Sequence, residues 1–341
     1  MVVLSIPVLD PLPIIKTHKA ISKTSSYTDI IPVIDLLDPR CGNHLVRACE
    51  EFGFFKVVNH GVSFDIISRI EGVAAKFFSL PLSDKERAGP ANPYGYGNRR
   101  IGPNGDVGWL EYLLSQTDPG SISQISKSIS RDNPNFFCVA VNDYVSAVRK
   151  LACELLDLLA KEMGIEPRNA FSGFLRDEKS EKESVFRMNH YPPCPELQSS
   201  SYNLIGFGEH SDPQIFSVLR SNSTSGLQIC LKDGIWVAVP SDPHSFYINV
   251  GDSLEVLTNG KFRSVRHRVV ANSQKSRVSM VYFGSPSLSA RVAPLACLLK
   301  EGEKRKYKGF TWSEYKKAAY ASRLADNRLD LFKADNNEER E

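Results

Sequence analysis

His210 and Asp212 stand two positions apart in segment 208–213 (GEHSDP). In a β-strand, residues i and i+2 project from the same face, roughly 6.6 Å apart at about 3.3 Å per residue, so both side chains can reach one ion. His267 lies 55 positions after Asp212, which leaves room for several strands before the chain returns. Two imidazoles and one carboxylate can hold one face of an octahedral iron and leave the other face open. The chain therefore needs a fold in which distant strands bring these three residues together.

Arg277 and Ser279 follow the second histidine in segment 277–283 (RVSMVYF). Alternation along a strand places them on one face, and a guanidinium fork beside a hydroxyl suits bidentate capture of a carboxylate. An open iron site with such a clamp predicts a dicarboxylate cosubstrate like 2-oxoglutarate, as in non-haem Fe(II) oxygenases. Two alternatives stay open: a His-x-Asp pair that arises by chance, and an Arg277 that forms a surface salt bridge.

Composition places the chain among ordinary globular proteins. Its 341 residues are enough for a large core in one domain or in two closely packed ones. Hydrophobic residues make up 42% and charged residues 24%, as in soluble proteins. The formal net charge of +3 is too small to indicate a nucleic acid or a membrane surface as partner.

Cysteine usage and the absence of long apolar stretches bear on location. The seven cysteines are odd in number and include no CxxC pair, so neither a disulfide framework nor a zinc site is indicated. A reduced intracellular compartment fits this pattern. The N-terminus lacks the features of a signal peptide, and no apolar stretch reaches membrane-spanning length. We therefore expect a cytoplasmic protein.

The first half of the chain reads as an arm followed by mostly helical patterns. Residues 1–27 lack a clear period, and Ser83 with Glu86 has the spacing of a capping box. Segment 88–108 is rich in Gly, Pro and Asn and is predicted to be a loop. We expect a short strand at 31–36 and helices over 42–52, 63–79 and 134–164.

The second half switches to short apolar or alternating runs with turns between them. Such a pattern favours a sandwich or a rolled double sheet. Thr311 and Glu314 form a second capping box before the last helix, and the charged tail after about 333 is expected to fray. The predicted strands are 215–219, 227–231, 235–239, 246–250 and 254–257. The predicted segments are an N-terminal arm (1–27), an N-terminal region of helices and strands (28–165), a strand-rich catalytic domain (166–290) and a C-terminal helical segment with its tail (291–341).

Several stretches together resemble a known family, the plant 2-oxoglutarate- and Fe(II)-dependent dioxygenases. They are 51–61 (EFGFFKVVNHG), 187–194 (RMNHYPPC), His210-x-Asp212, 259–268 (NGKFRSVRHR) and Arg277-x-Ser279, and the resemblance covers about residues 28–325. It implies a mainly β fold with flanking α-helices, built on a double-stranded β-helix, or jelly roll. It also implies Fe(II), 2-oxoglutarate and O2 as reactants, succinate and CO2 as products, and ascorbate as a supporting reductant.

Two further stretches look like the gibberellin 2-oxidases that act on nineteen-carbon gibberellins. They are 94–114 (YGYGNRRIGPNGDVGWLEYLL) and 206–215 (GFGEHSDPQI), and Ser211 stands where that family usually carries Thr. The Leu-Pro-Trp-Lys-Glu-Thr type of segment found in gibberellin 20-oxidases is absent from the sequence. The resemblance implies 2β-hydroxylation of a gibberellin, which inactivates the hormone.

Residue roles follow from the motifs. The predicted iron ligands are His210, Asp212 and His267, and the predicted cosubstrate residues are Arg277, Ser279, Tyr191 and Asn189. A rigid apolar substrate with a carboxylate needs apolar walls and a cation or hydroxyl, and the candidates are Arg99, Arg100, Trp109 and Tyr112. Each candidate could instead be solvated or packed, and Tyr191 could be a packed strand residue. His60, His190 and His244 are not proposed as ligands, and Cys194 is expected to be a surface thiol.

Three functional alternatives remain at this level. The enzyme could hydroxylate another gibberellin position or a flavonoid-like small molecule, and a hormone-binding protein could keep the fold without turnover. The intact triad and Arg277-x-Ser279 disfavour pure binding, because binding alone does not need them. The partner is a small molecule in each case, and a homo-oligomer is left open.

Overall fold

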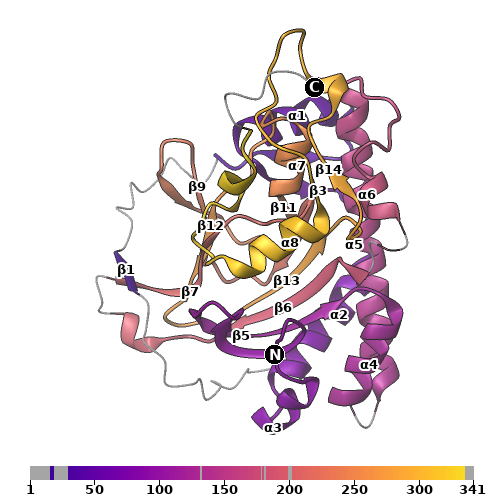
Figure 1. Cartoon of the computed structure of the whole chain (residues 1–341). Coiled ribbons are helices and arrows are strands. Elements are labelled where there is room, and N and C mark those ends of the chain that lie inside the picture. The colour runs from indigo at the N-terminus through magenta and orange to yellow at the C-terminus, as the bar shows by residue number, and fades with distance from the viewer. Residues whose placement is uncertain are drawn as a thin grey trace.

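Two β-sheets face each other and helices cover one of them in the computed structural model (Figure 1). The structure describes residues 30–130, 133–177, 179, 182–198 and 202–334, together with the backbone of residues 16–18. Most of the predicted N-terminal arm and residues 335–341 of the predicted frayed tail lie outside the described residues. None of the described helices is both long and apolar enough to cross a membrane.

The large sheet has eight strands in the order β2-β3-β11-β8-β13-β6-β5-β4. Residue 165 is the predicted boundary between the second and third segments, and strands from both of these segments belong to this sheet. The segment boundaries themselves stay predictions. Its members are β2 (Val33–Asp35), β3 (Phe54–Val58), β4 (Gly95–Ile101), β5 (Asp106–Gln116), β6 (Val185–Tyr191), β8 (Phe216–Ser221), β11 (Phe246–Val250) and β13 (Arg277–Gly284).

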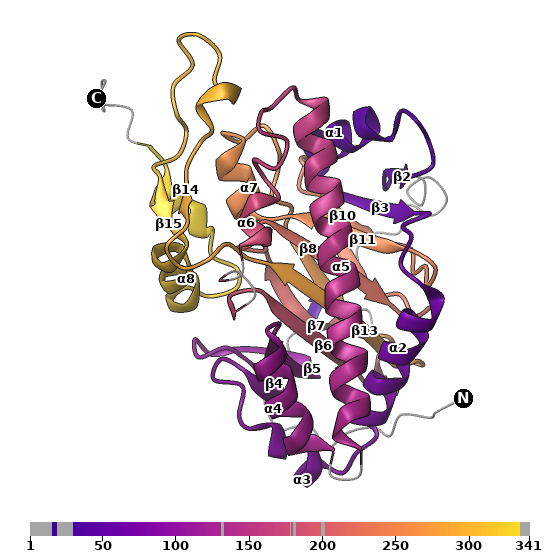
Figure 2. The same ribbon diagram turned by 90° about the vertical axis from the view of Figure 1, so that its right-hand side faces the viewer.

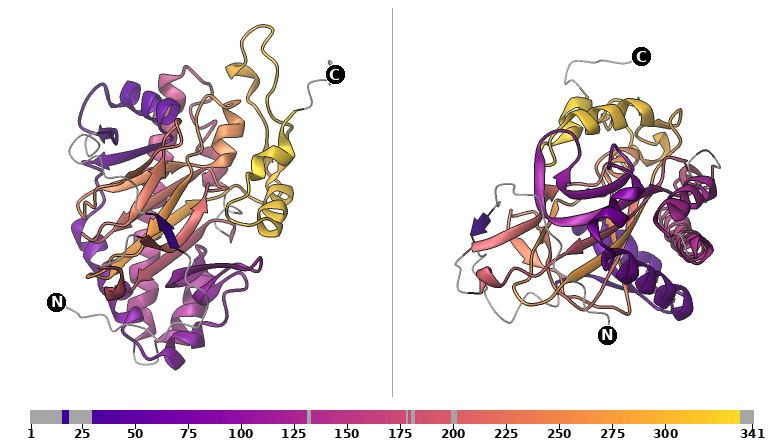
Figure 3. Two further views of the ribbon diagram at one scale, coloured as in Figure 1. Left: turned by 90° about the vertical axis from the view of Figure 1, so that its left-hand side faces the viewer. Right: turned by 90° about the horizontal axis from the view of Figure 1, so that it is seen from below.

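The small sheet has five strands in the order β1-β7-β12-β9-β10 and lies against the inner face of the large one (Figure 3). An apolar cluster between the sheets contains residues of both, among them Tyr112 and Val281 of the large sheet and Phe207 and Val269 of the small one. Its strands are β1 (Lys16–His18), β7 (Tyr202–His210), β9 (Leu227–Cys230), β10 (Trp236–Ala238) and β12 (His267–Val270), and a separate pair is formed by β14 (Arg291–Val292) and β15 (Phe310–Thr311). The predicted jelly-roll architecture is confirmed.

Helices pack on the outer face of the large sheet, and the longest of them, α5 (Pro134–Glu162), runs across that face (Figure 2). It starts with Pro134 after Asn133, whose side chain caps the Phe136 N–H, and its buried stripe includes Val148 and Leu155. The other helical segments are α1 (Cys41–Glu51), α2 (Phe64–Phe78), α3 (Leu82–Lys85), η1 (Glu86–Ala88), α4 (Pro119–Ile129), α6 (Gly173–Arg176), η3 (Pro195–Leu197), α7 (Asp252–Leu257), η4 (Ala296–Leu298), α8 (Trp312–Ala321) and η5 (Arg328–Phe332).

Most local predictions agree with the structure. The strand predicted at 246–250 coincides with β11, and the long helix predicted at 134–164 is α5. The capping box of the last helix is present, with Thr311 and Glu314 each accepting from the other's backbone N–H. These elements are set by local pattern, which a sequence carries directly.

Three local predictions are wrong. Segment 88–108 contains β4 and the start of β5, because its glycines serve turns at Gly102 and Gly105, both at positive φ, and not an extended loop. Helix α3 begins after Pro81 without a side-chain cap, so Ser83 forms no capping box. The apolar run 254–257 is the end of α7, and so short a run has no period that separates strand from helix.

Candidate metal centre and cosubstrate site

Three side chains converge at one end of the small sheet. His210 is the last residue of β7, His267 is the first residue of β12, and the two are paired across the antiparallel ladder. Asp212 lies in the loop after β7. The expectation that His210 and Asp212 project from one face of the same strand is therefore wrong, because the strand ends at His210. One ligand atom from each residue lies within 4.8 Å of the others. Asp212 Oδ1 lies 3.6 Å from His210 Nε2 and 3.7 Å from His267 Nε2.

Hydrogen bonds orient each of these side chains toward the others. His210 Nδ1 lies 2.8 Å from the Gly208 carbonyl oxygen and His267 Nδ1 lies 3.2 Å from that of Val265. A proton on each Nδ1 satisfies these contacts and leaves Nε2 with a lone pair, which is the usual arrangement of metal-bound histidine.

Asp212 is held by two side chains that the sequence analysis missed. Its Oδ2 accepts from Ser217 Oγ at 2.6 Å and from Asn249 Nδ2 at 2.9 Å. Oδ1 is thereby left facing the imidazoles. Ser217 of β8 and Asn249 of β11 are paired in register, and that pairing brings Asn249 to Asp212. Ser217 is only five residues from Asp212, but no motif in the sequence marks it as a partner.

The protonation states suit a divalent cation. Burial, together with the neighbouring His267, lowers the pKa of His210 to about 3, so its imidazole is neutral at physiological pH. Burial alone would raise the pKa of Asp212, but the imidazoles and the bonds from Asn249 and Ser217 keep it below the usual value. Two imidazole nitrogens and one carboxylate oxygen on one side of a site fit iron(II) with open positions opposite.

The predicted clamp residues lie together on the inner face of the large sheet. β13 and β6 pair Arg277 with Tyr191 and Ser279 with Asn189. Asn189 Nδ2 donates to Ser279 Oγ at 3.3 Å, and the guanidinium carbon of Arg277 lies 5.3 Å from the Tyr191 ring centroid. The Tyr191 and Ser279 hydroxyls are also hydrogen-bonded.

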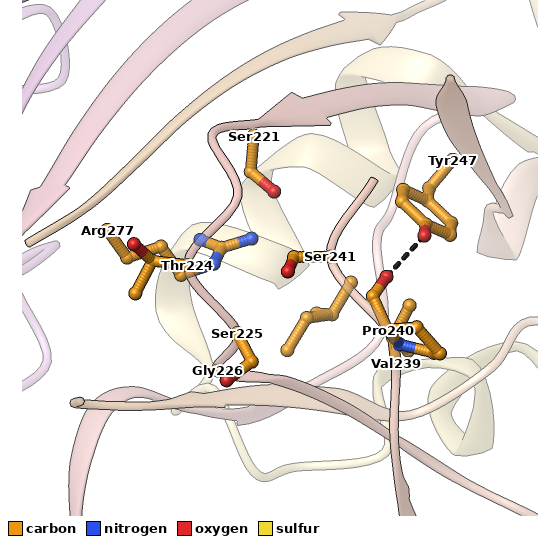
Figure 4. A pocket seen from close by; sticks show the side chains of 10 residues that line it. Ser221, Thr224, Ser225, Gly226, Val239, Pro240, Ser241, Tyr247 and Arg277 are labelled. Atoms are coloured by element: carbon orange, nitrogen blue, oxygen red, sulfur yellow. Dashed lines mark hydrogen bonds between the residues drawn. The ribbon is translucent and has the colours of Figure 1, made fainter. Parts of the chain in front are cut away.

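Arg277 is the cation of this group. It is 2% exposed, and its Nη1 has no hydrogen-bond partner among the described residues. Burial lowers the pKa of Arg277, although a guanidinium stays charged. A small pocket lies beside it, lined by Ser221, Thr224 and Tyr247 among others (Figure 4). An unsatisfied buried guanidinium beside hydroxyls fits a carboxylate ligand.

The four candidate substrate residues fall into different environments. Tyr112 is buried on the inner face opposite Asn189, and its hydroxyl donates to the Arg100 carbonyl oxygen at 2.9 Å. Trp109 Nε1 donates to the Pro192 carbonyl oxygen at 3.0 Å, and the Trp109 ring lies 5.2 Å from the guanidinium carbon of Arg99. The Arg100 side chain is exposed. Tyr112 is thus the candidate that the fold brings next to the predicted cosubstrate residues.

The remaining histidines and Cys194 have other surroundings. The described groups that could hold a metal do not include His60, His190 or His244. His190 points to the helix side, where its Nδ1 lies 2.8 Å from Glu111 Oε1. The expectation of a surface thiol was wrong, because Cys194 is buried in an apolar cluster with Leu197 and Leu204.

Two family models match the chain. The model of the 2OG-Fe(II) oxygenase superfamily matches residues 182–286. The model named for the N-terminal part of the non-haem dioxygenase in morphine synthesis matches residues 31–128. A solved structure, JOX2 in complex with 2OG, Fe and JA, is 27% identical with a TM-score of 0.76 and covers 89% of each chain. A dioxygenase for auxin oxidation in rice, 24% identical with a TM-score of 0.73, shares the fold and covers 89% of this chain and all of that one. Fold and site together define a 2-oxoglutarate- and Fe(II)-dependent oxygenase.

Closer relatives identify the family within that class. A gibberellin 2-beta-dioxygenase of Phaseolus coccineus is 56% identical over 97% of this chain and 98% of its own. Gibberellin 2-beta-dioxygenase 2 of Arabidopsis thaliana is 53% identical over 97% and 96%, and gibberellin 2-beta-dioxygenase 1 of Pisum sativum is 53% identical over 97% and 98%. The chain belongs to the gibberellin 2-beta-dioxygenase family.

Proposed function

We propose that this enzyme hydroxylates gibberellins at the 2β position and thereby inactivates the hormone. Identity of 51–56% to four gibberellin 2-beta-dioxygenases over at least 92% of the chain supports this activity. The single structural observation that carries it is the convergence of the His210, Asp212 and His267 ligand atoms within 4.8 Å, on the sheet that faces the buried Arg277.

His210, Asp212 and His267 would hold the iron. When bound, iron(II) and 2-oxoglutarate supply the activation of O2, with succinate and CO2 as products and ascorbate as a supporting reductant. The chain contributes fixed geometry: the carbonyl oxygens of Gly208 and Val265 orient the imidazoles, and the bonds to Asp212 Oδ2 direct its other oxygen to the metal. Ligands fixed in this way need no rearrangement to bind.

Arg277, Ser279 and Tyr191 would bind the distal carboxylate of 2-oxoglutarate, with Asn189 beside them. The Arg277 guanidinium supplies charge and two parallel N–H donors, and the hydroxyls of Ser279 and Tyr191 supply further donors. All four side chains are at most 4% exposed. A carboxylate bound there is shielded from water, which strengthens its attraction to the guanidinium.

The substrate would lie between the sheets, against Tyr112 and near Trp109, with Arg99 and Arg100 at the edge where β4 meets β5. A bulge interrupts the pairing of these two strands between Asn98 and Arg100. We place the enzyme in the cytoplasm, which is supported by the seven cysteines, none of which forms a disulfide.

The decisive experiment is product analysis by mass spectrometry. The protein is incubated with Fe(II), ascorbate, 2-oxoglutarate and a bioactive nineteen-carbon gibberellin, and parallel reactions omit iron or 2-oxoglutarate. A 2β-hydroxylated product that needs both supports the proposal. Turnover of 2-oxoglutarate with a flavonoid but not with gibberellin, or hydroxylation at another carbon, would contradict it. Gibberellin binding without succinate release would indicate a binding protein.

A further inference from the structure

Arg187 has an unusual position that its sequence context does not reveal. It is the third residue of β6 and shares the inner face of the large sheet with Asn189 and Tyr191. Its guanidinium carbon lies 3.8 Å from the ring centroid of Tyr112 on β5 and 4.7 Å from that of Phe207 on β7. The guanidinium is therefore held between two aromatic faces, one from each sheet, inside the space that the sheets enclose.

The hydrogen bonds of Arg187 are incomplete. Its Nε donates to Asn189 Oδ1 at 2.7 Å, whereas its Nη2 is buried with no partner among the residues that the structure describes. No carboxylate forms an ion pair with it in that part of the chain. An enclosed N–H donor without a partner costs stability, and a bound ligand can supply the missing acceptor.

Arg187 lies beside the metal site and outside the cosubstrate clamp. The Phe207 ring that contacts it also lies 4.6 Å from the His210 ring. The Asn189 side chain accepts from Arg187 and donates to Ser279, so it separates the two groups. Along β6, Arg187 is four residues from Tyr191, the partner of Arg277, which corresponds to roughly 13 Å.

Charge balance indicates what Arg187 binds. Iron(II), the Asp212 carboxylate, the 2-oxoglutarate dianion and the Arg277 guanidinium together carry no net charge. Arg187 adds one positive charge to the same enclosed space, and this charge calls for one further anion. The apolar cluster between the two sheets, which includes Phe207, Val269 and Val281, suits a rigid apolar molecule that carries a single carboxylate.

We propose that Arg187 binds the carboxylate of the substrate and sets the specificity of the enzyme for carboxylic acids. This inference rests on the proposed function and assigns to Arg187 the charge recognition that Arg99 and Arg100 were expected to supply. The Arg100 side chain faces solvent, and the Arg99 guanidinium lies against Trp109. Arg187 is half-buried with an enclosed Nη2, and its guanidinium contacts the Phe207 ring that lies against His210. Arg99 is also buried, but it lies on β4, the edge strand of the large sheet.

The test compares a gibberellin with its methyl ester, which keeps the skeleton and loses the charge. Wild type, Arg187→Met and Arg187→Gln are loaded with Mn(II) and 2-oxoglutarate under argon, and each compound is titrated by calorimetry. We expect wild type to bind the acid about 10- to 100-fold more tightly than the ester, as for a hydrogen-bonded charge pair. In both variants the acid should bind only as well as the ester.

Two controls separate recognition from folding. The affinity for 2-oxoglutarate and the affinity for the ester should be unchanged in the Arg187 variants, which a merely structural defect would not allow. Arg40→Met removes an arginine side chain that is 77% exposed and should keep the full preference for the acid. If the Met variant fails to fold, the Gln variant decides, since its amide can still donate to Asn189.

The outcomes are distinguishable. An undiminished preference for the acid in the Arg187 variants overturns the assignment, as does a loss of 2-oxoglutarate affinity with that preference intact, which would place Arg187 in the clamp. Wild-type protein that binds neither compound overturns the gibberellin proposal itself, and this inference falls with it. A preference that disappears in the variants and persists in Arg40→Met supports the assignment.

Discussion

The two faces of strands β5 and β6 bury charge in opposite ways. On the helix side, Glu111 Oε2 accepts from Lys85 Nζ at 2.7 Å and from the Tyr96 hydroxyl at 2.5 Å, and its Oε1 lies 2.8 Å from His190 Nδ1. Every charge in this group has a partner. On the inner face, Arg187 and Arg277 each keep a buried N–H group with no partner among the described residues.

This difference distinguishes the charged residues that stabilise the sheet from the charged residues that are available to bind a ligand. A buried ion pair with all its hydrogen bonds made holds elements together, and here it ties the α3 region to β4, β5 and β6. A buried cation left unsatisfied weakens the fold and is retained where a ligand completes it. The helix side should therefore govern stability, and the inner face should govern binding.

The largest expected effect is at the metal. His210→Ala removes one of three ligands, so we expect no product and no stoichiometric iron in the purified protein, while the melting temperature stays near that of the wild-type apoprotein. His244→Ala, which removes an exposed imidazole, is the control. Elemental analysis measures the iron content, and mass spectrometry measures the hydroxylated product. A fully active His210→Ala protein would show that His210 is not an iron ligand.

The next largest effect concerns the helix side. Lys85→Met leaves Glu111, which is fully buried, without its cation, and should lower the free energy of unfolding by about 3 kcal/mol. The KM for 2-oxoglutarate should not change. Urea denaturation measures the free energy of unfolding, and steady-state kinetics measure the KM for 2-oxoglutarate. Lys150→Met, at an exposed ion pair, should cost less than about 1 kcal/mol.

Acid should shrink the Lys85→Met deficit. Burial would raise the pKa of Glu111, but its bonds to His190, Lys85 and Tyr96 keep that pKa below the ordinary value. Its contribution to stability is therefore complete at neutral pH, above the unfolded-state pKa, and is lost as the pH falls through the lowered folded-state value. A deficit that stays constant on acidification would contradict the role given to Glu111.

A smaller effect is expected at the clamp. Arg277→Met keeps the aliphatic stem and removes the guanidinium, so the KM for 2-oxoglutarate should rise about 10- to 100-fold. Stability should be unchanged or higher, because the variant no longer buries an unpaired cation. Lys85→Met serves as the converse control, since it should change stability and leave this KM alone. An unchanged KM in Arg277→Met would exclude it from the clamp.

The smallest effect probes the substrate wall. A Cβ at Gly97 would lie 2.2 Å from the Tyr112 ring, so Gly97→Ala forces that ring to move off the Arg187 guanidinium. We expect the KM for gibberellin to rise about threefold to tenfold, with the KM for 2-oxoglutarate unchanged. Gly72→Ala on α2, where a Cβ meets open space, is the matched control. Equal gibberellin kinetics in both variants would remove Tyr112 from the substrate wall.

Local pattern was sufficient for part of the fold, and the sequence motifs named the three side chains that converge at the end of β7. The periodicity of 246–250 and 134–164 and the Thr311 capping box predict elements that the structure contains, because each depends on residues within a few positions of one another. Pattern failed at 88–108 and 254–257. In segment 88–108 the glycines allow turns and leave room for the neighbouring Tyr112 ring. In segment 254–257 a short apolar run is helical because of the residues it packs against.

The sequence by itself determined which atoms can ligate iron and which side chains can clamp a carboxylate, because chemistry belongs to residue type and spacing. Tertiary structure alone decided that Ser217 and Asn249 hold Asp212 and that Tyr112 and Phe207 enclose Arg187. Asn249 and Tyr112 are far in the chain from the residues that they contact, and these contacts depend on strand order, register and the approach of two sheets. Those features result from burying the apolar faces of both sheets at once, which no local segment specifies.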